Sequence, residues 1–371
     1  MHMGNYILFF RTPPPYGGGE IVNEYLIKYW GKSQFIVALS NKNASKSSQG
    51  KLNYQNLFYS IKNIIHIHRI LSKSKPKIIF IGLSKSLIPY LRDVIILIIA
   101  RIKDIGVIGD LHGMGFNMNI NNNIISKSIF NWSINKYQAI RFLSHSIKNH
   151  VRQSGFNGRC YVIDNGISKS KDSFSKTYSP LEKISLFYFG AISKSKGIEI
   201  CLKLILKLKD NNINYKFTVI GEFVDTSTRI FVKEFIEQND LSQFVKLEGR
   251  LLDSEKFDCI SDQHLLLHAS KWDGQPLTVL ESMSFGIPSI VSDVGALPET
   301  VQNGITGFVV TDFQSEAYNY IIAIITGKIS YDRLSQQCVE VFNKRFSIEI
   351  CANKIDEMLN YEANNTIPKN G

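Results

Sequence analysis

The clearest candidates for chemistry are two carboxylates within residues 271–301, which read KWDGQPLTVLESMSFGIPSIVSDVGALPETV. Asp273 precedes Glu281 by eight residues, and Gly274 and Pro276 lie between them, ahead of a short apolar helix. This spacing predicts an exposed turn and a helix N-terminus between two carboxylates. Amides at a helix N-terminus favour an anion, and carboxylates accept from hydroxyls. The site therefore suits the phosphate and the polyol of a sugar nucleotide.

The same run resembles the signature of a large family of retaining glycosyltransferases, glycosyltransferase family 4 or glycosyl transferases group 1, with an acid-x7-acid motif. The family usually has Glu at both positions, whereas this chain has Asp273 at the first. Two acids at this spacing are common by chance, but FGIPSIVSDVG and PETV follow in register. The alternative is a helix and strand of an unrelated α/β domain. The resemblance implies an α/β fold of two facing Rossmann-like domains (GT-B), with a cleft between them and a C-terminal helix returning to the first.

The order of apolar runs predicts two parallel sheets with helices on their faces, which suits a chain of 371 residues. In the first half, strands are expected at 6–10, 35–39, 77–81, 106–111, 139–143 and 160–163. In the second half, they are expected at 185–189, 217–220, 245–248, 265–268 and 289–292. The serine-rich run SKSKDSFSKTYSP at residues 168–180 predicts an interdomain linker.

Domain boundaries follow from these elements and from the resemblance. An N-terminal acceptor-binding Rossmann-like domain is expected over 1–168, and a C-terminal donor-binding Rossmann-like domain over 180–346. Ser347 is expected to cap a helix over 347–362 that packs back on the first domain. Residues 363–371 are predicted to be a disordered tail. The C-terminal helix has one apolar face, formed by Ile348, Ala352, Ile355 and Leu359.

The positive charge is confined to one half of the chain. Residues 1–170 contain 22 Lys and Arg against 6 Asp and Glu, whereas the remainder contains 21 against 26. A basic half indicates an anionic partner for that half, such as a membrane surface, a lipid diphosphate or nucleic acid. Nucleic acid ranks last, because the sequence shows no reader motif and no basic stripe interleaved with aromatics. A lysine-rich composition from a biased genome is the alternative.

One apolar segment and the cysteines indicate where in the cell the protein is expected. VIILIIA at residues 94–100 is far shorter than the roughly twenty residues of a membrane span, and it predicts a buried helix rather than an interfacial anchor. Residues 5–11 read as a first strand and not as a secretory signal. Five scattered cysteines without metal-ligand spacing favour a reducing cytoplasm.

Two turns of the first domain are expected to face ligands. The run PPPYGGGE at residues 13–20 follows the first strand, and its glycines allow a backbone to approach a phosphate closely. By resemblance, Gly17 and Gly18 lie over the donor diphosphate and the acceptor. The run GDLHG at residues 109–113 ends a later strand, where open α/β sheets bind ligands. The resemblance implies that His112 contacts the transferred sugar.

The run GAISKSKG at residues 190–197 resembles the family's loop that grips the diphosphate. Gly190 and Lys196 match it, and Lys196 is implied to stabilise charge on the leaving group. The usual arginine is replaced by Ala191, and losing one such donor costs about 3 kcal/mol of charge stabilisation. Lys194 is the candidate substitute.

The remaining donor contacts are also implied by resemblance. Glu281 would accept from the ribose hydroxyls and Asp273 from those of the transferred sugar. Asp is one methylene shorter than Glu, so its reach falls by about 1.5 Å. Gly221 and Glu222 would form the turn beside the nucleotide. Arg250 and Leu251 would belong to the loop beside the base. Gly274, Gln275, Pro276 and Leu277 would lie around the transferred sugar. Arg250 would either stack on the base or be a solvated charge.

The sequence predicts no metal site. It has no Asp-x-Asp at a strand end and no His/Cys cluster with ligand spacing. His66 and His68 stand two apart in a helical stretch, so they do not face each other. We expect no cofactor and no divalent metal, with a nucleoside diphosphate sugar as co-substrate. Lys196, backbone amides and helix dipoles would meet its charge.

These features predict a retaining, metal-independent hexosyltransferase acting on a hydroxyl of a lipid-linked glycan in bacterial O-antigen or capsule biosynthesis. The basic half predicts a peripheral position on the anionic inner face of the cell membrane, in the cytoplasm, with no nucleic acid partner. Two alternatives remain. One is a degenerate, non-catalytic nucleotide-sugar-binding protein, indicated by Ala191 and Asp273. The other is a nucleotide-sugar epimerase on the same fold.

Overall fold

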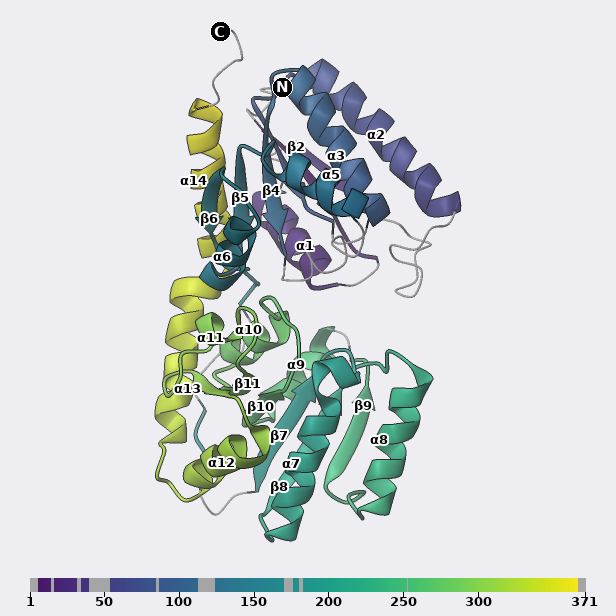
Figure 1. The fold of residues 1–371 in the computed structure, drawn as a ribbon. Coiled ribbons are helices and arrows are strands. Elements are labelled where there is room, and N and C mark those ends of the chain that lie inside the picture. The colour runs from purple at the N-terminus through teal and green to yellow at the C-terminus, as the bar shows by residue number, and fades with distance from the viewer. Residues whose placement is uncertain are drawn as a thin grey trace. The chain divides into compact units, whose positions relative to one another are not determined.

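The computed structural model describes residues 6–14, 17–31, 35–39, 54–84, 87–112, 124–169, 176–179, 183–251 and 253–365. The chain divides into two compact units, one formed by Met1–Gly166 with Ile348–Gly371 and the other by Ile167–Ser347. Each unit is a parallel sheet with helices, which confirms the expected α/β fold of two Rossmann-like domains (Figure 1).

The first unit is built on near-continuous apolar strands, the pattern of strands buried on both faces. In the described residues they form one parallel sheet in the order β2-β1-β3-β4-β5-β6. The strands are β1 (Tyr6–Arg11), β2 (Phe35–Leu39), β3 (Ile78–Gly82), β4 (Gly106–Leu111), β5 (Ala139–Phe142) and β6 (Arg159–Val162). The helices are α1 (Gly18–Trp30), α2 (Tyr54–Ser74), α3 (Leu87–Ile102), α5 (Ile124–Ile134), α6 (His145–Gln153) and α14 (Ile348–Asn364).

Helix α14 returns to the first unit, as expected, and packs against α1 and β3 (Figure 1). Its predicted apolar face is buried, and the Trp30 indole donates to Asp356 at 3.0 Å. Near its end the fully buried Glu362 accepts from Arg159 and Tyr161, each at 2.6 Å. The helix continues to Asn364, so the prediction of disorder from residue 363 is wrong for its first two positions. Residues 366–371 of that predicted tail lie outside the described residues.

The apolar run at residues 94–100 lies in α3, but the prediction of a buried helix is wrong for one of its faces. Val94 and Leu97 are buried, whereas Ile95 and Ile98 are exposed. An apolar run with no alternation does not reveal which of its side chains meet the sheet. Among the residues that the structure describes, no helix is both long and apolar enough to cross a membrane.

The second unit has a parallel sheet in the order β12-β11-β10-β7-β8-β9 in its described part. The strands are β7 (Ile184–Phe189), β8 (Tyr215–Ile220), β9 (Val245–Gly249), β10 (Leu265–His268), β11 (Ser289–Ser292) and β12 (Gly307–Val310). Its helices are α7 (Ile198–Asp210), α8 (Thr226–Gln238), α9 (Asp253–Ser261), α10 (Leu277–Ser284), α11 (Leu297–Thr300), α12 (Tyr318–Ile325) and α13 (Tyr331–Val341). Shorter turns are η3 (Lys194–Lys196), η4 (Phe313–Ala317) and η5 (Phe342–Phe346).

The strand order of the second unit reverses at β7, which pairs with β8 on one side and β10 on the other. Ligands of open α/β sheets bind outside the carboxyl ends of the strands at such a point. The loops after β7 and β10 are therefore the places where this unit can hold a ligand.

Part of the predicted linker packs on the second unit. The Tyr178 ring lies 5.1 Å from the His264 ring and 5.8 Å from the Tyr331 ring, measured between centroids. Residues 170–175 and 180 of that linker lie outside the described residues. The second unit itself begins at Ile167.

Candidate functional site

The predicted donor residues of the second unit lie on loops at one edge of its sheet. Parallel strands present their carboxyl ends at the same edge, so loops that follow neighbouring strands gather there. The loop after β10 carries Asp273 and residues 274–277, and the loop after β7 carries Gly190, Lys194 and Lys196. The loop after β8 carries Gly221 and Glu222, and the loop after β9 carries Arg250 and Leu251.

Two glycines allow these loops to touch. Gly221 has a φ of +148°, and a Cβ atom there would lie 1.8 Å from the Gly190 carbonyl oxygen. Gly197 has a φ of +82°, and its Cβ would lie 2.0 Å from the Ala269 carbonyl oxygen. The loop after β7 is therefore held against its neighbours by backbone contacts that leave no room for a side chain.

Asp273 is the centre of the site. Its Oδ2 atom accepts from the Lys196 ammonium at 2.7 Å and lies 2.9 Å from the His268 Nε2 atom. Burial alone raises the pKa of a carboxyl group, but hydrogen bonds and charges from His268 and Lys196 outweigh it and hold the pKa of Asp273 well below its usual range. The side chain is therefore an ionised acceptor at neutral pH.

Sequence reasoning missed His268, the last residue of β10, which is buried. Its position at the carboxyl end of a strand is a signal that could have found it. Lys194, the candidate substitute for the family arginine, is exposed, and its ammonium lies 5.2 Å from the centre of the Phe231 ring on α8. Of these two lysines, it is Lys196 that contacts Asp273 in the described part of the chain.

Helix α10 begins beside Asp273 with an N-terminus that no side chain caps. Its N-cap residue is Pro276, and Leu277 is its first residue. The Thr278 hydroxyl is buried without a hydrogen-bond partner among the described residues, and its methyl group lies 3.7 Å from the Cβ position of Gly190. The first amides of a helix have no intrahelical acceptor and attract anions. The Leu277 and Thr278 amides and the Thr278 hydroxyl, which the sequence did not single out, are donors available to a phosphate, whereas the Val279 amide donates to the Pro276 carbonyl.

The second predicted acid, Glu281, lies one turn further along α10 and is nearly buried. Its Oε1 atom accepts from the Lys256 ammonium of α9 at 2.8 Å, so the carboxylate has a fixed cationic partner. Nothing in the local sequence distinguishes Lys256 from a solvated lysine. At the neighbouring loops, an Arg250 nitrogen lies 3.8 Å from a Glu222 oxygen.

The turn into α10 is tied to the following segment. The Gly274 carbonyl accepts from the Ala296 amide at 3.2 Å, and the Gln275 side-chain amide donates to the Thr300 hydroxyl at 3.4 Å. These bonds fix the backbone on which Asp273 and the start of α10 sit. The sugar-binding role predicted for residues 274–277 stays a prediction.

In the first unit, the glycine-rich turn and His112 come together. Gly17 is the N-cap of α1 and Gly18 its first residue, at the end of the turn that follows β1. A Cβ atom on Gly19 would lie 3.5 Å from the His112 ring, so the glycines allow the turn to approach that side chain. The His112 Nε2 atom lies 2.8 Å from Asp110, whereas its buried Nδ1 atom has no hydrogen-bond partner in the described residues. That nitrogen is available to a ligand.

The Asp110 carboxylate that contacts His112 belongs to a buried ion pair with Arg141. The Arg141 guanidinium lies 3.1 Å from Asp110 and also donates to the Ile163 and Asp164 carbonyls. Burial alone would raise the pKa of Asp110, but the charges of Arg141 and His112 outweigh it and lower that pKa. The sequence did not identify this pair. Ser144 caps α6 by accepting from the Ile147 amide at 3.1 Å.

Groups of three or more His, Cys, Asp or Glu that could hold a metal ion do not occur among the described residues. His66 and His68 lie on α2, in the helical stretch where they were expected, and both are exposed.

The fold is that of solved glycosyltransferases of GT-B architecture. The chain superposes on Anabaena HepE in complex with UDP with a TM-score of 0.73 and 16% identity, covering 96% of this chain and 100% of that one. It superposes on a glycosyltransferase from Rickettsia africae with a TM-score of 0.76 and 16% identity, covering 98% and 100%. At such identities the likeness shows the fold alone.

Residues 169–339 match the family described as Glycosyl transferases group 1, which confirms the resemblance for this part of the chain. Relatives include a 41.2 kDa protein in the cps region of Klebsiella pneumoniae, 31% identical over 129 residues (35% of this chain, 33% of that protein). Glycosyltransferase MJ1178 of Methanocaldococcus jannaschii is 26% identical over 233 residues (62% of each). The amylovoran biosynthesis glycosyltransferase AmsK of Erwinia amylovora is 22% identical over 151 residues (39% and 36%). The matches span from a third to about three fifths of these relatives' length.

Proposed function

We propose that this chain is a glycosyltransferase that moves a hexosyl group from a nucleoside diphosphate sugar to a hydroxyl of a glycan. The observation that carries the proposal is the ionised Asp273 carboxylate, held by Lys196 and His268 beside the uncapped start of α10. One place thus offers a cation and amides for a diphosphate together with an acceptor for sugar hydroxyls. The UDP bound by HepE and the polysaccharide role in the name of AmsK support this substrate class.

The donor is assigned to the second unit. Lys196 and the first amides of α10 bind the diphosphate, and they stabilise the negative charge that grows on it as the sugar leaves. Glu281 accepts from the ribose hydroxyls, with Lys256 holding the carboxylate in place. The loops after β8 and β9, which carry Glu222 and Arg250, border the base.

We assign acceptor binding to the first unit. We also assign to His112 the contact with the transferred sugar. The unpartnered Nδ1 atom of His112 supports this assignment, because the Asp110–Arg141 pair fixes the other ring nitrogen. Gly17 and Gly18 supply a backbone surface without side chains at the same turn.

The proposed reaction retains the anomeric configuration and uses no divalent metal. The acceptor oxygen bonds to the anomeric carbon on the face from which the phosphate oxygen leaves. The carbon–oxygen bond to the diphosphate breaks, and the departing diphosphate takes the acceptor's proton. Lys196 and helix amides then stabilise the charge that a metal ion stabilises in other transferases.

The proposed acceptor is a lipid-linked glycan of a bacterial surface polysaccharide, and the proposed location is the cytoplasmic face of the cell membrane. The excess of basic residues in the first 170 positions supports this, because each basic side chain near an anionic surface contributes about 1 kcal/mol to binding. Co-sedimentation with anionic vesicles that weakens with salt is the expected result, and no association at any salt concentration contradicts this part of the proposal.

A second candidate function is nucleotide-sugar binding without transfer. Ala191 favours it, because this residue stands where the family carries an arginine and Lys194 contacts α8 instead. Calorimetric titration with UDP, GDP and ADP in EDTA, followed by assays with labelled nucleotide sugars, separates the two. Tight binding followed by transfer supports the enzyme, whereas binding with no turnover supports the second candidate. Failure to bind any of the three contradicts both.

A further inference from the structure

The exposed side of α3 is aliphatic. Among its described residues, every side chain in the exposed class is apolar: Leu91, Ile95, Ile98 and Ile102, which are between 36% and 77% exposed. Their spacing of four, three and four residues places them on one stripe. A surface helix of a globular protein normally presents charged or polar residues to water. The exposed face of α3 is therefore unusual for a helix surface that contacts only water.

Helix α2 packs beside α3 (Figure 1) and carries exposed apolar side chains of its own. Its side chains Phe58, Ile61 and Ile65 stand three and four residues apart and are between 46% and 56% exposed. We call these three and the four aliphatic residues of α3 the docking face. Exposed apolar stripes on two neighbouring helices indicate a binding site for a partner or a membrane.

The charge around the docking face has one sign on α2. The sequence of α2 contains no Asp or Glu, and its exposed cations are Lys62, Arg69 and Lys73. An apolar helix face bordered by lysine and arginine is the arrangement of helices that lie in a membrane interface. The neighbouring α5 adds the exposed Trp132, with the Lys136 ammonium 5.6 Å from the centre of its ring.

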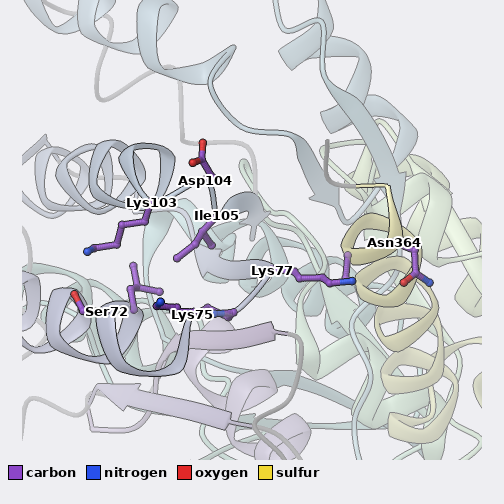
Figure 2. A pocket seen from close by; sticks show the side chains of 10 residues that line it. Ser72, Lys75, Lys77, Lys103, Asp104, Ile105 and Asn364 are labelled. Carbon is purple, nitrogen blue, oxygen red and sulfur yellow. The ribbon is translucent and has the colours of Figure 1, made fainter. Parts of the chain in front are cut away.

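A cavity of about 670 Å³ lies at the C-terminal ends of α2 and α3, where the docking face ends (Figure 2). Three lysines line it, namely Lys75, Lys77 and Lys103, and we call it the lysine pocket. Figure 2 shows Lys77 on the side of Asn364 of α14, with Lys75 and Lys103 on the side of α2 and α3.

The three ammonium groups of the lysine pocket have no ion pair and no hydrogen bond within the described part of the chain. One carboxylate, Asp104, also lines the cavity, so cations outnumber it. The lining also includes apolar side chains, among them Leu71 and Ile105. Unpaired cations over an apolar wall suit a phosphate group attached to a hydrophobic body.

We propose that the docking face lies on an anionic lipid bilayer and that the lysine pocket holds the phosphate of one of its lipids. The inference rests on the proposed function, to which it adds the surface that meets the membrane. A second copy of this chain is the competing occupant. Pairing two docking faces would bring the cations of α2 against each other with no acid on that helix to compensate, whereas a bilayer with anionic lipids complements them.

The test uses the full chain and vesicles of phosphatidylcholine with or without phosphatidylglycerol. Replacing two stripe residues, I95D/I98D, puts charges where the interface would be, and we expect at least a tenfold loss of binding to the mixed vesicles. The matched control, V224D/I230D, makes the same change at residues of the second unit that are 63% and 51% exposed. It should bind as the unaltered chain does. Equal binding by both variants overturns the proposal.

The lysine pocket has its own variant, K75Q/K77Q/K103Q. We expect it to lose most of the preference for phosphatidylglycerol while its weak binding to pure phosphatidylcholine is unchanged. The control K233Q/K328Q/K344Q removes the same charge from exposed lysines of the second unit. If both variants lose this preference equally, net charge alone determines it, and the assignment of a lipid phosphate to the lysine pocket is overturned.

Two further measurements keep the outcomes apart. Light scattering tests self-association, and a dimer that I95D/I98D dissociates overturns the membrane assignment. Nucleotide titration of I95D/I98D and of K75Q/K77Q/K103Q should match the unaltered chain, because these residues lie in the first unit and the donor is assigned to the second. Loss of vesicle binding with intact nucleotide binding therefore supports the docking face. Absent nucleotide binding in every sample, the unaltered chain included, contradicts the proposed function instead.

Discussion

The Lys196 ammonium lies 2.7 Å from the Asp273 carboxylate, although 77 residues separate the two in the sequence. Lys196 comes from the turn after β7 and Asp273 from the loop after β10, the two strands that are neighbours where the sheet order reverses. The pair links the group assigned to the diphosphate with the group assigned to the sugar. A change at either residue should therefore alter the recognition of both parts of the donor.

Lys196→Ala should lower kcat/KM by about 100- to 1,000-fold, the effect of removing one donor aimed at developing charge. Lys194→Ala is the matched control, because Lys194 lies two residues away and contacts Phe231 instead. It should change kcat/KM less than threefold. Initial rates with a nucleotide sugar, with circular dichroism to verify folding, measure both. A larger loss for Lys194→Ala would assign the missing arginine's role to Lys194.

Asp273→Asn should lower the free energy of unfolding at pH 7, because Lys196 and His268 lose their ionised partner. The folded state lowers the pKa of Asp273, so its contribution is fully present above the unfolded pKa of about 3.9 and is lost as pH falls toward the folded value. The difference between variant and unaltered chain should thus shrink below about pH 4. Urea unfolding at a series of pH values measures it.

The control for that series is Asp258→Asn, at an exposed position on α9. It should leave the free energy of unfolding nearly unchanged across the same pH range. If the Asp273→Asn difference persists undiminished at acid pH, the effect comes from packing and not from the ionised carboxylate.

The apolar pattern predicted strand positions well because strands buried on both faces are continuous apolar runs. The runs at 106–111 and 265–268 coincide with β4 and β10. The prediction missed β12, which has four residues and begins with a glycine. The same pattern could not separate Ile95 and Ile98 of α3, which are exposed, from Ile96 and Leu97, which are buried, since all four are isoleucine or leucine.

The site was predictable where its residues stand in one motif and not where they meet across the chain. Asp273 and Glu281 belong to one run, whereas Lys256 reaches Glu281 from 25 residues away. Arg141 likewise pairs with Asp110 from 31 residues away. Such partners depend on the packing of separate elements, which local spacing does not encode.

Gly197→Ala should destabilise the second unit by several kcal/mol, because a Cβ atom there would lie 2.0 Å from the Ala269 backbone oxygen. Gly304→Ala is a matched control, since its φ of +75° is close to the +82° of Gly197 and nothing lies within 4 Å of its Cβ position. That change should cost only about 1 kcal/mol for the left-handed backbone. Thermal unfolding of both variants tests the difference. Equal losses would mean that the backbone angle, and not the close contact, requires glycine.

Arg141→Met should destabilise the first unit by about 3 to 5 kcal/mol, because it leaves the buried Asp110 carboxylate without its 3.1 Å partner. The double variant D110N/R141M removes both charges and should recover part of that loss. Arg229→Met, at an exposed position of α8, should change stability by less than about 0.5 kcal/mol. Urea unfolding of the three variants measures these differences. A double variant no more stable than Arg141→Met would show that Arg141 acts through its bonds to the Ile163 and Asp164 carbonyls, since these are lost in both.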